Sequence, residues 1–218
     1  MLHTIRLLLS RTTAYQIIRS YRRQHSPDIQ VRSWISAGMP IPPPHRVKQD
    51  TLRFYAESYG LRIFVETGTY LGDMVEALNG IFRRIYTFEI NSELSANARR
   101  RFKWYSHVRV IEGDSGKELE RLMPDIDEPC LFWLDGHYSG GITGRGEKDT
   151  PIYEELSHIF AASDLGHVIV IDDARCFGTE PTYPAIEALE QFVKRHRPNA
   201  EIVIENDSIR ILPRHTKK

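Results

Sequence analysis

The sequence predicts an α/β fold with a doubly wound, mostly parallel sheet and helices on both of its faces. Between residues 62 and 195, short runs rich in Val, Ile, Phe and Leu alternate with stretches of helical periodicity. Such alternation is typical of parallel strands connected by helices. The last apolar runs instead alternate in polarity on both sides of Asn206 and Asp207, which predicts an antiparallel hairpin at the end of the chain.

Length and composition fit one ordinary domain with an appendage. The chain has 218 residues, of which 41% are hydrophobic and 27% are charged. Its 29 basic and 29 acidic side chains give a formal net charge of zero, so no overall charge attracts it to nucleic acid or to an anionic membrane. No apolar stretch reaches the roughly 20 residues of a membrane helix. We therefore expect no nucleic-acid partner and no transmembrane segment.

The two cysteines, Cys130 and Cys176, each lie beside an apolar run. Isolated thiols in such positions are typical of reduced core residues, because disulfide frameworks belong to cysteine-rich secreted domains. The run of three leucines near the N-terminus is too short for the core of a secretory signal. Together these observations predict a cytoplasmic protein.

The first 27 residues form a basic segment, with no acidic residue before Asp28. A helix over residues 3–23 would gather apolar side chains on one face, although Arg19 and Arg23 fall on that face too. One interpretation is a basic helix that packs on the domain or on a second copy of the chain, as in a homodimer. The other is a helix that binds a membrane surface or directs the protein to an organelle, because such helices are also basic and poor in acids.

The segment MPIPPPH, residues 39–45, is rich in proline. Proline breaks a helix and stiffens a linker. We therefore predict a helical extension with its linker over residues 1–45 and one domain over residues 46–218. A helix over residues 47–59, ended by Gly60, opens this domain because glycine is the usual residue after a helix end.

The elements of the sheet follow in order. Apolar runs with many β-branched and aromatic residues predict strands, and stretches of helical periodicity predict helices. The predicted strands are 62–66, 84–89, 108–112, 130–134 and 167–171. The predicted helices are 73–79, 92–105, 116–122, 151–161 and 184–195. Ligands of a doubly wound sheet bind beyond the carboxyl ends of its strands, so the residues that follow each strand are the candidate site.

The first strand is followed by a glycine-containing turn, VETGTYLG, in which Gly68 and Gly72 are four residues apart. Glycines at such positions allow a tight turn and a close approach to a ligand, and the next helix directs its N-terminal amides to the same place. The spacing is not the G-x-G-x-x-G of dinucleotide enzymes, and a phosphate-binding loop is absent. The sequence therefore disfavours NAD and ATP as ligands.

The VETGTYLG turn resembles the first motif of the class I S-adenosylmethionine-dependent methyltransferases, whose fold is Rossmann-like. The second strand ends at Glu89, about 20 residues after the turn, where a carboxylate can accept both hydroxyl hydrogens of a ribose. The third strand is followed by GDS, which in the family contacts the adenine. The resemblance implies S-adenosylmethionine as the cofactor, bound by Glu66, Thr67, Gly68, Thr69, Tyr70, Gly72, Glu89, Gly113, Asp114, Ser115 and Asp135.

Three aspartates follow the fourth and fifth strands: Asp135, Asp172 and Asp173. Neighbouring strand ends would bring these carboxylates together, and three clustered anions need a counter-charge such as Mg²⁺, which prefers oxygen ligands. The pattern resembles the metal-dependent macrocin O-methyltransferases and, more loosely, their cephalosporin hydroxylase and rhamnosyl O-methyltransferase relatives. The resemblance implies that all three aspartates bind the metal. An alternative is that one of Asp172 and Asp173 only caps a turn.

His137 follows Asp135 by two residues, and we predict that both act in catalysis. A metal-bound acceptor hydroxyl has a lowered pKa, and an imidazole beside it can remove the proton. The alternative role for His137 is to orient a loop.

These resemblances imply a seven-stranded sheet whose last strand is antiparallel, and they predict metal-assisted O-methylation of a small molecule or sugar. Two other functions stay open. One is a metal-independent methyltransferase that acts on nitrogen or on a macromolecule. The other is a non-catalytic module that binds the cofactor and uses its basic N-terminus to bind a partner.

Overall fold

The computed structural model describes residues 27–136 and 150–214. The chain divides into two compact units, Met1–Lys48 and Gln49–Lys218. The helix predicted over residues 3–23 lies outside the described residues. In the first unit the structure has a helix that the sequence analysis did not predict, α3 (Pro27–Ser36). The domains predicted as 1–45 and 46–218 stay a proposal.

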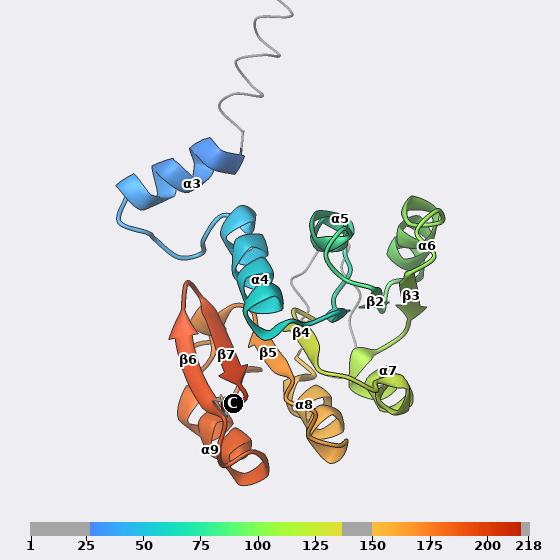
Figure 1. The fold of residues 1–218 in the computed structure, drawn as a ribbon. Helices are drawn as coiled ribbons and strands as arrows, with labels where there is room; N and C mark the ends of the chain where they lie inside the picture. The colour runs from blue at the N-terminus through green and yellow to red at the C-terminus, as the bar shows by residue number, and fades with distance from the viewer. Residues whose placement is uncertain (1–26, 137–149, 215–218) are drawn as a thin grey trace, which may run out of the picture. The chain divides into compact units, whose positions relative to one another are not determined.

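The second unit contains a seven-stranded sheet of order β3-β2-β1-β4-β5-β7-β6 (Figure 1). The first five strands run parallel, whereas β7 is antiparallel to both of its neighbours. This arrangement confirms the predicted fold class and its C-terminal hairpin. The strands are β1 (Ile63–Thr67), β2 (Arg84–Glu89), β3 (Val108–Glu112), β4 (Cys130–Leu134), β5 (Val168–Ile171), β6 (Glu201–Glu205) and β7 (Ser208–Leu212).

Helices cover both faces of the sheet, and each face has its own core. On one face α7 (Ser115–Leu122), α8 (Ile152–Ala161) and α9 (Ile186–His196) pack on the strands. On the other face α4 (His45–Tyr59), α5 (Asp73–Leu78) and α6 (Ser92–Arg101) contribute their buried side chains. Because successive strand residues point to opposite faces, every residue of β1 is buried, as expected for a strand that is covered on both sides.

The hairpin turn between β6 and β7 consists of Asn206 and Asp207, both with positive φ, 49° and 61°. Two left-handed residues are the backbone of a type I′ turn, which matches the twist of a hairpin. The prediction of a hairpin at these two residues is therefore confirmed.

Most element bounds differ from the predicted ones by one or two residues, but α6 is an exception. It ends at Arg101, four residues before the predicted end at 105. Its cap residue Phe102 has φ −99° and ψ 10°, and the ring of Phe102 is buried in the core beneath α6. The chain turns here because this aromatic side chain packs inward.

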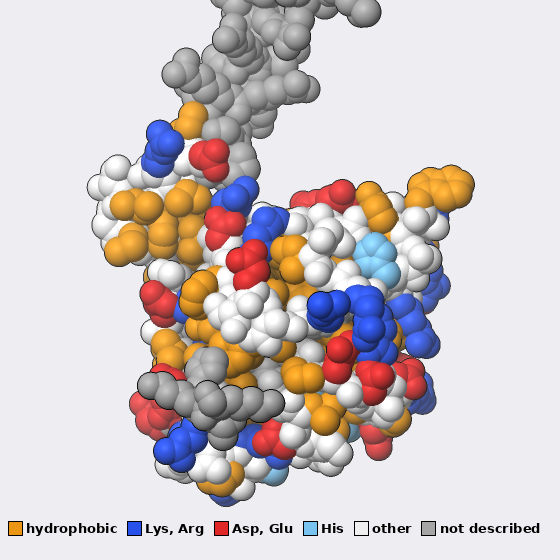
Figure 2. All heavy atoms as spheres, viewed as in Figure 1, with side chains coloured by type: hydrophobic (Ala, Val, Ile, Leu, Met, Phe, Trp, Pro, Cys, Tyr) orange, Lys and Arg blue, Asp and Glu red, His pale blue; other side chains and the backbone are white. Residues whose placement is uncertain are grey.

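Basic and acidic side chains lie interspersed on the face seen in Figure 2. This mixture agrees with the formal net charge of zero. Among the described residues, none of the helices combines the length and the apolar character that crossing a bilayer would require.

Candidate functional site

The turn between β1 and α5 brings three strand ends together. The backbone N–H groups of Gly68 and Thr69 both donate to the carbonyl oxygen of Phe88 in β2, at 3.0 and 2.9 Å. Gly68 has φ 84°, and a Cβ added to it would lie 2.4 Å from the backbone oxygen of Asp135, beyond the end of β4. Only glycine combines this conformation with so close an approach. The turn is therefore fixed against both neighbouring strands.

Gly72 serves a second close contact in the same turn. Its φ is 83°, and an added Cβ would lie 2.8 Å from the Phe102 ring. Between the two glycines, Tyr70 also has a positive φ, 49°, and its side chain is exposed. The turn thus packs on α6 through Gly72 while Tyr70 faces solvent.

Glu89 ends β2 as a buried carboxylate held by backbone groups. Its Oε2 accepts the N–H of Tyr70 at 2.8 Å, and its Oε1 accepts the N–H of Asn91 at 2.9 Å. A carboxylate has about four acceptor positions, so each oxygen keeps capacity for a further donor. Glu89 is therefore oriented beside the glycine turn and can accept hydroxyl groups from a ligand.

Glu66 lies deeper, near the end of β1. Its Oε2 accepts a hydrogen bond from Thr87 Oγ1 at 2.5 Å, and the Thr69 and Thr87 hydroxyls are also 2.5 Å apart. Burial raises the pKa of Glu66 to about 8, against the opposing effect of the Thr87 hydrogen bond. Glu66 therefore carries a proton at neutral pH. Through Thr87, which contacts both Glu66 and Thr69, it also connects the turn to β2. Its contact with a cofactor stays a prediction.

The third predicted group follows β3. Gly113 has φ 146° and donates its N–H to the backbone oxygen of Glu89 at 3.0 Å. Asp114 caps α7, because its Oδ1 accepts the N–H of Gly116 at 3.0 Å. The hydroxyl of the next residue, Ser115, is directed to the interior. The ends of β1, β2 and β3 therefore present the predicted residues at one edge of the sheet.

Glu155 of α8, which no sequence motif singled out, is only 1% exposed. Ser115 Oγ donates to Glu155 Oε1 at 2.6 Å, and Thr67 forms a second side-chain hydrogen bond with it. Burial raises the pKa of Glu155 to about 7, although both hydrogen bonds lower it. A signal was present, because Glu155 lies between Ile152 and Ile159 on the apolar face of the predicted helix.

Glu155 also limits the size of the side chain at position 136, which follows Asp135. A Cβ added to Gly136 would lie 3.0 Å from Thr67 Oγ1 and 3.1 Å from Glu155 Oε1. Thr67 in turn accepts the N–H of Asp135, at 3.2 Å both to its Oγ1 and to its backbone oxygen. One buried carboxyl group thus bonds to the end of β1 and to the segment after β3, and it lies close to Gly136 after β4.

The structure brings Asp135, Asp172 and Asp173 together. One carboxylate oxygen from each lies within 4.8 Å of the others, and Asp172 and Asp173 are buried. Because β4 and β5 pair in parallel, the residues after both strands lie at the same edge of the sheet. There the N–H of Asp172 donates to the Leu134 oxygen at 3.0 Å. Three oxygen donors within this range suit a hard divalent cation.

Arg175 supplies positive charge beside this cluster. Its guanidinium contacts Asp173 at 2.7 Å and also pairs with the buried Asp207 of the hairpin turn. Asp173 has φ 56° and precedes a 3-10 helix, Ala174–Cys176, but its side chain makes no capping hydrogen bond there. The alternative that one of Asp172 and Asp173 only caps a turn stays open. The donor set of the cluster fits Mg²⁺, and Arg175 holds the Asp173 carboxylate from one side.

Tyr183 lines a small cavity together with Asp172, and burial raises its pKa, with smaller contributions from Cys176 and the three aspartates. No sequence motif singled out Tyr183. His137, the predicted base, lies outside the described residues.

Comparison with known proteins gives the fold a name. No protein-family model and no curated protein matches the sequence. An O-methyltransferase from Bacillus cereus, solved in complex with S-adenosylhomocysteine, is 16% identical with a TM-score of 0.56, over 90% of this chain and 97% of that chain. A methyltransferase from Podospora anserina, also bound to S-adenosylhomocysteine, is 19% identical with a TM-score of 0.54, over 94% of this chain and 97% of that chain.

An N-methyltransferase from Bradyrhizobium japonicum, NodS, is similar in the same way. It is 15% identical with a TM-score of 0.53, over 78% of this chain and 97% of that chain. Methyltransferases with oxygen and nitrogen acceptors thus share this arrangement of strands and helices. The chain has the fold of the class I S-adenosylmethionine-dependent methyltransferases.

Proposed function

We propose that this protein is an S-adenosylmethionine-dependent methyltransferase. The observation that carries the proposal is the position of Glu89, a buried carboxylate fixed by the Tyr70 N–H directly beside the glycine turn. Each of its oxygens can accept one ribose hydroxyl. In this proposal Glu66, Thr67, Gly68, Thr69, Tyr70 and Gly72 line the cofactor, and Gly113, Asp114 and Ser115 face its adenine.

The residues around this edge support the binding of a nucleoside rather than a phosphate. A phosphate site would use the N-terminal amides of the helix after the turn, but α5 has only six residues and two acids in its first turn, Asp73 and Glu76. Arg101 pairs with both acids, at 2.7 Å from Asp73 and 3.8 Å from Glu76, so one net negative charge is left here to disfavour an anion. A cationic sulfonium with a neutral adenosine fits this environment better.

We further propose that Asp135, Asp172 and Asp173 hold Mg²⁺ for the methylation of a hydroxyl group on a small molecule or sugar. The clustering of their oxygens within 4.8 Å supports this proposal. When bound, Mg²⁺ would lower the pKa of an acceptor hydroxyl. Arg175 would keep Asp173 in place, and because it also pairs with Asp207, its own charge stays compensated.

The chemistry that the chain itself must supply is orientation. Methyl transfer is a direct displacement at the sulfonium methyl group, so the acceptor oxygen has to lie in line with the breaking bond. Asp135 is suited to this task because it lies between the glycine turn, through Gly68, and the other two aspartates. His137 remains the proposed base.

The test is isothermal titration of the full chain with S-adenosylhomocysteine, with and without Mg²⁺. We expect micromolar binding in both conditions. Absence of binding in both would overturn the proposal. An acceptor screen then decides the metal role: activity that chelation abolishes and Mg²⁺ restores supports it, and activity that survives chelation favours a metal-independent methyltransferase.

A further inference from the structure

The carboxyl group of Glu155 is in contact with residues of both proposed sites, although it is a proposed ligand of neither. Ser115, which follows β3, donates its hydroxyl to Glu155 at 2.6 Å, and the hydroxyl of Thr67, at the end of β1, forms a second hydrogen bond with it. Ser115 is one of the residues proposed to face the adenine. Thr67 contacts Asp135, the first aspartate of the proposed metal site.

Thr67 connects Glu155 to Asp135 by two successive hydrogen bonds. An ionised carboxylate can only accept hydrogen bonds, so the Thr67 hydroxyl donates its hydrogen to Glu155. The lone pairs of Thr67 Oγ1 then accept the backbone N–H of Asp135, at 3.2 Å. The acceptor that holds the Asp135 backbone is therefore itself oriented by Glu155.

The segment that carries Asp135 also packs directly on Thr67 and Glu155. At the next residue, Gly136, an added Cβ would lie 3.0 Å from Thr67 Oγ1 and 3.1 Å from Glu155 Oε1. Gly136 and Glu155 line one small cavity together with Asp172, the second aspartate of the cluster. Removal of the Glu155 carboxylate would therefore weaken both the hydrogen bonding and the packing that hold the Asp135 segment.

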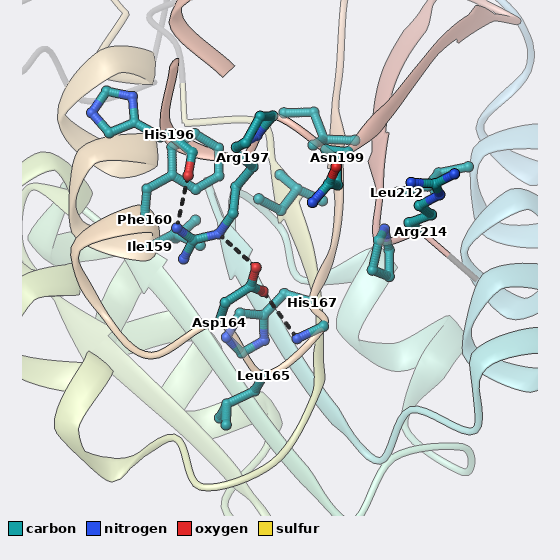
Figure 3. A pocket seen from close by; sticks show the side chains of 16 residues that line it. Ile159, Phe160, Asp164, Leu165, His167, His196, Arg197, Asn199, Leu212 and Arg214 are labelled. Carbon is teal, nitrogen blue, oxygen red and sulfur yellow. Dashed lines mark hydrogen bonds and ion pairs between the residues drawn. The ribbon is translucent and has the colours of Figure 1, made fainter. Parts of the chain in front are cut away.

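The helix that carries this carboxyl group is itself firmly held. Glu155 lies in the first turn of α8, whose apolar face is buried against the sheet. At the other end of α8, the guanidinium of Arg197 pairs with Asp164 at 3.1 Å and lies 5.2 Å from the centre of the Phe160 ring (Figure 3). Groups that orient a site are most precise on packed, regular elements of this kind.

We propose that Glu155 is a positioning residue of the metal site, which acts through Thr67 to fix the Asp135 backbone and so keeps the Asp135 carboxylate beside the other two aspartates. This role rests on the proposed function, in which the three aspartates hold Mg²⁺. Residues that orient metal ligands without touching the metal contribute strongly to affinity, and their removal costs about 10- to 100-fold. Glu155 is thus expected to control metal affinity although it is no ligand.

The test is Mn²⁺ binding, measured by electron paramagnetic resonance titration of the full chain and of Glu155→Leu. Leucine has a similar volume but accepts no hydrogen bond, so we expect about tenfold weaker Mn²⁺ binding. Glu155→Gln keeps an acceptor oxygen and should restore the affinity to within about threefold of the parent. Circular dichroism at the titration temperature shows that each variant is folded.

Two further measurements separate positioning from a loss of stability. Val193→Ala shortens a buried side chain of α9 in the same core, so it destabilises the fold but should bind Mn²⁺ as the parent does. Thr67→Val removes the connecting hydroxyl and should weaken Mn²⁺ as much as Glu155→Leu does. Because the two residues act in one chain of hydrogen bonds, the double variant should bind Mn²⁺ no more weakly than either single variant.

Three results would overturn this role while leaving the proposed function intact, provided that the parent chain binds Mn²⁺. The first is equal Mn²⁺ affinity in Glu155→Leu and the parent. The second is an equal loss in Val193→Ala, because the loss would then follow from stability. The third is a double variant in which the two single losses multiply, because Glu155 and Thr67 would then act independently. A parent chain that binds no Mn²⁺ overturns the proposed metal role and this inference together.

Discussion

The backbone N–H of Tyr70 donates a 2.8 Å hydrogen bond to the carboxylate of Glu89, in addition to the hydrogen bonds that Gly68 and Thr69 donate to Phe88. Tyr70 has a positive φ, 49°, a conformation that costs energy for a residue other than glycine. The charged acceptor offsets that cost. The contact therefore positions the carboxylate and stabilises the turn at once.

Substitution of Glu89 should separate binding from folding. In Glu89→Gln one of the two backbone N–H groups, of Tyr70 or Asn91, faces an amide NH₂ instead of an oxygen, and one ribose acceptor is lost. We expect about 10- to 100-fold weaker S-adenosylhomocysteine binding by isothermal titration. Glu112→Gln is the control. Glu112 lies opposite Glu89 in the register of β3 with β2, but its side chain is exposed. Equal affinity in parent and Glu89→Gln would contradict the proposed role.

Gly68→Ala tests the close approach of the turn to β4. The added methyl group would lie 2.4 Å from the Asp135 backbone oxygen, at a φ of 84°, so the turn has to move. We expect a loss of about 1–3 kcal/mol in the free energy of unfolding, measured in urea, together with loss of cofactor binding. Gly80→Ala is the matched control, since nothing lies within 4 Å of its added Cβ. A Gly68→Ala variant as stable as this control would show that the approach is looser than described.

The pH dependence of stability should reveal the buried acid Glu66. Its pKa rises from 4.5 in the unfolded chain to about 8 in the folded protein, so between these values the folded state binds the extra proton. Stability from this group is therefore fully present below about pH 4.5 and decreases as the pH rises toward 8. In Glu66→Gln this decrease should vanish, making the variant more stable than the parent at pH 8 and similar at pH 4.5. Parallel pH profiles of the two proteins in urea unfolding would refute the assignment.

Removal of the Glu155 carboxylate should loosen the packing of Thr67, Ser115 and Gly136 against α8. In Glu155→Leu the hydroxyls of Ser115 and Thr67 lose their acceptor in a buried position, which we expect to cost about 1–3 kcal/mol of unfolding free energy. Glu155→Gln keeps an acceptor oxygen and should lose less. Glu154→Gln, next to it on α8 and only partly buried, is the control. The same order in S-adenosylhomocysteine affinity is expected, and an unaffected affinity in Glu155→Leu would limit its role to folding.

The aspartate cluster can be tested by metal binding alone. We expect Mn²⁺, used as a spectroscopic substitute for Mg²⁺, to bind the full chain in electron paramagnetic resonance titrations. Asp172→Asn should weaken it about tenfold or more, because one of three carboxylate ligands is lost. Asp125→Asn, which changes an exposed acid in a 3-10 helix, should have no effect. Identical titrations for Asp172→Asn and the parent would rule out the proposed metal site.

The sheet could be predicted because its strands have a strong local signal. The five parallel strands are rich in apolar residues, and polar residues lie at or directly after their ends. Both the fold and the convergence of Asp135 with Asp172 and Asp173 follow from this pattern and the strand order. The helix α3 was missed because its sequence, PDIQVRSWIS, has a weak apolar pattern. The early end of α6 depends on the burial of the Phe102 ring, which is a tertiary contact.

The contacts that orient the site were harder to predict. Glu155 is far in sequence from Thr67 and Ser115, and only the packing of α8 brings the three side chains together. The pairing of Arg175 with both Asp173 and Asp207 likewise depends on the position of the hairpin turn next to β5. Contacts of this kind cannot be predicted from the composition of the chain or the spacing of its residues.

The lack of a side chain at Gly136 has an evolutionary consequence. Its position is closed on one side by Thr67 and on the other by Glu155, so a larger residue there requires smaller partners at both places. Among relatives of this chain, residues 67, 136 and 155 should therefore vary together rather than singly. A larger residue at position 136, introduced to change the acceptor, would therefore first need a smaller residue at position 155 in α8.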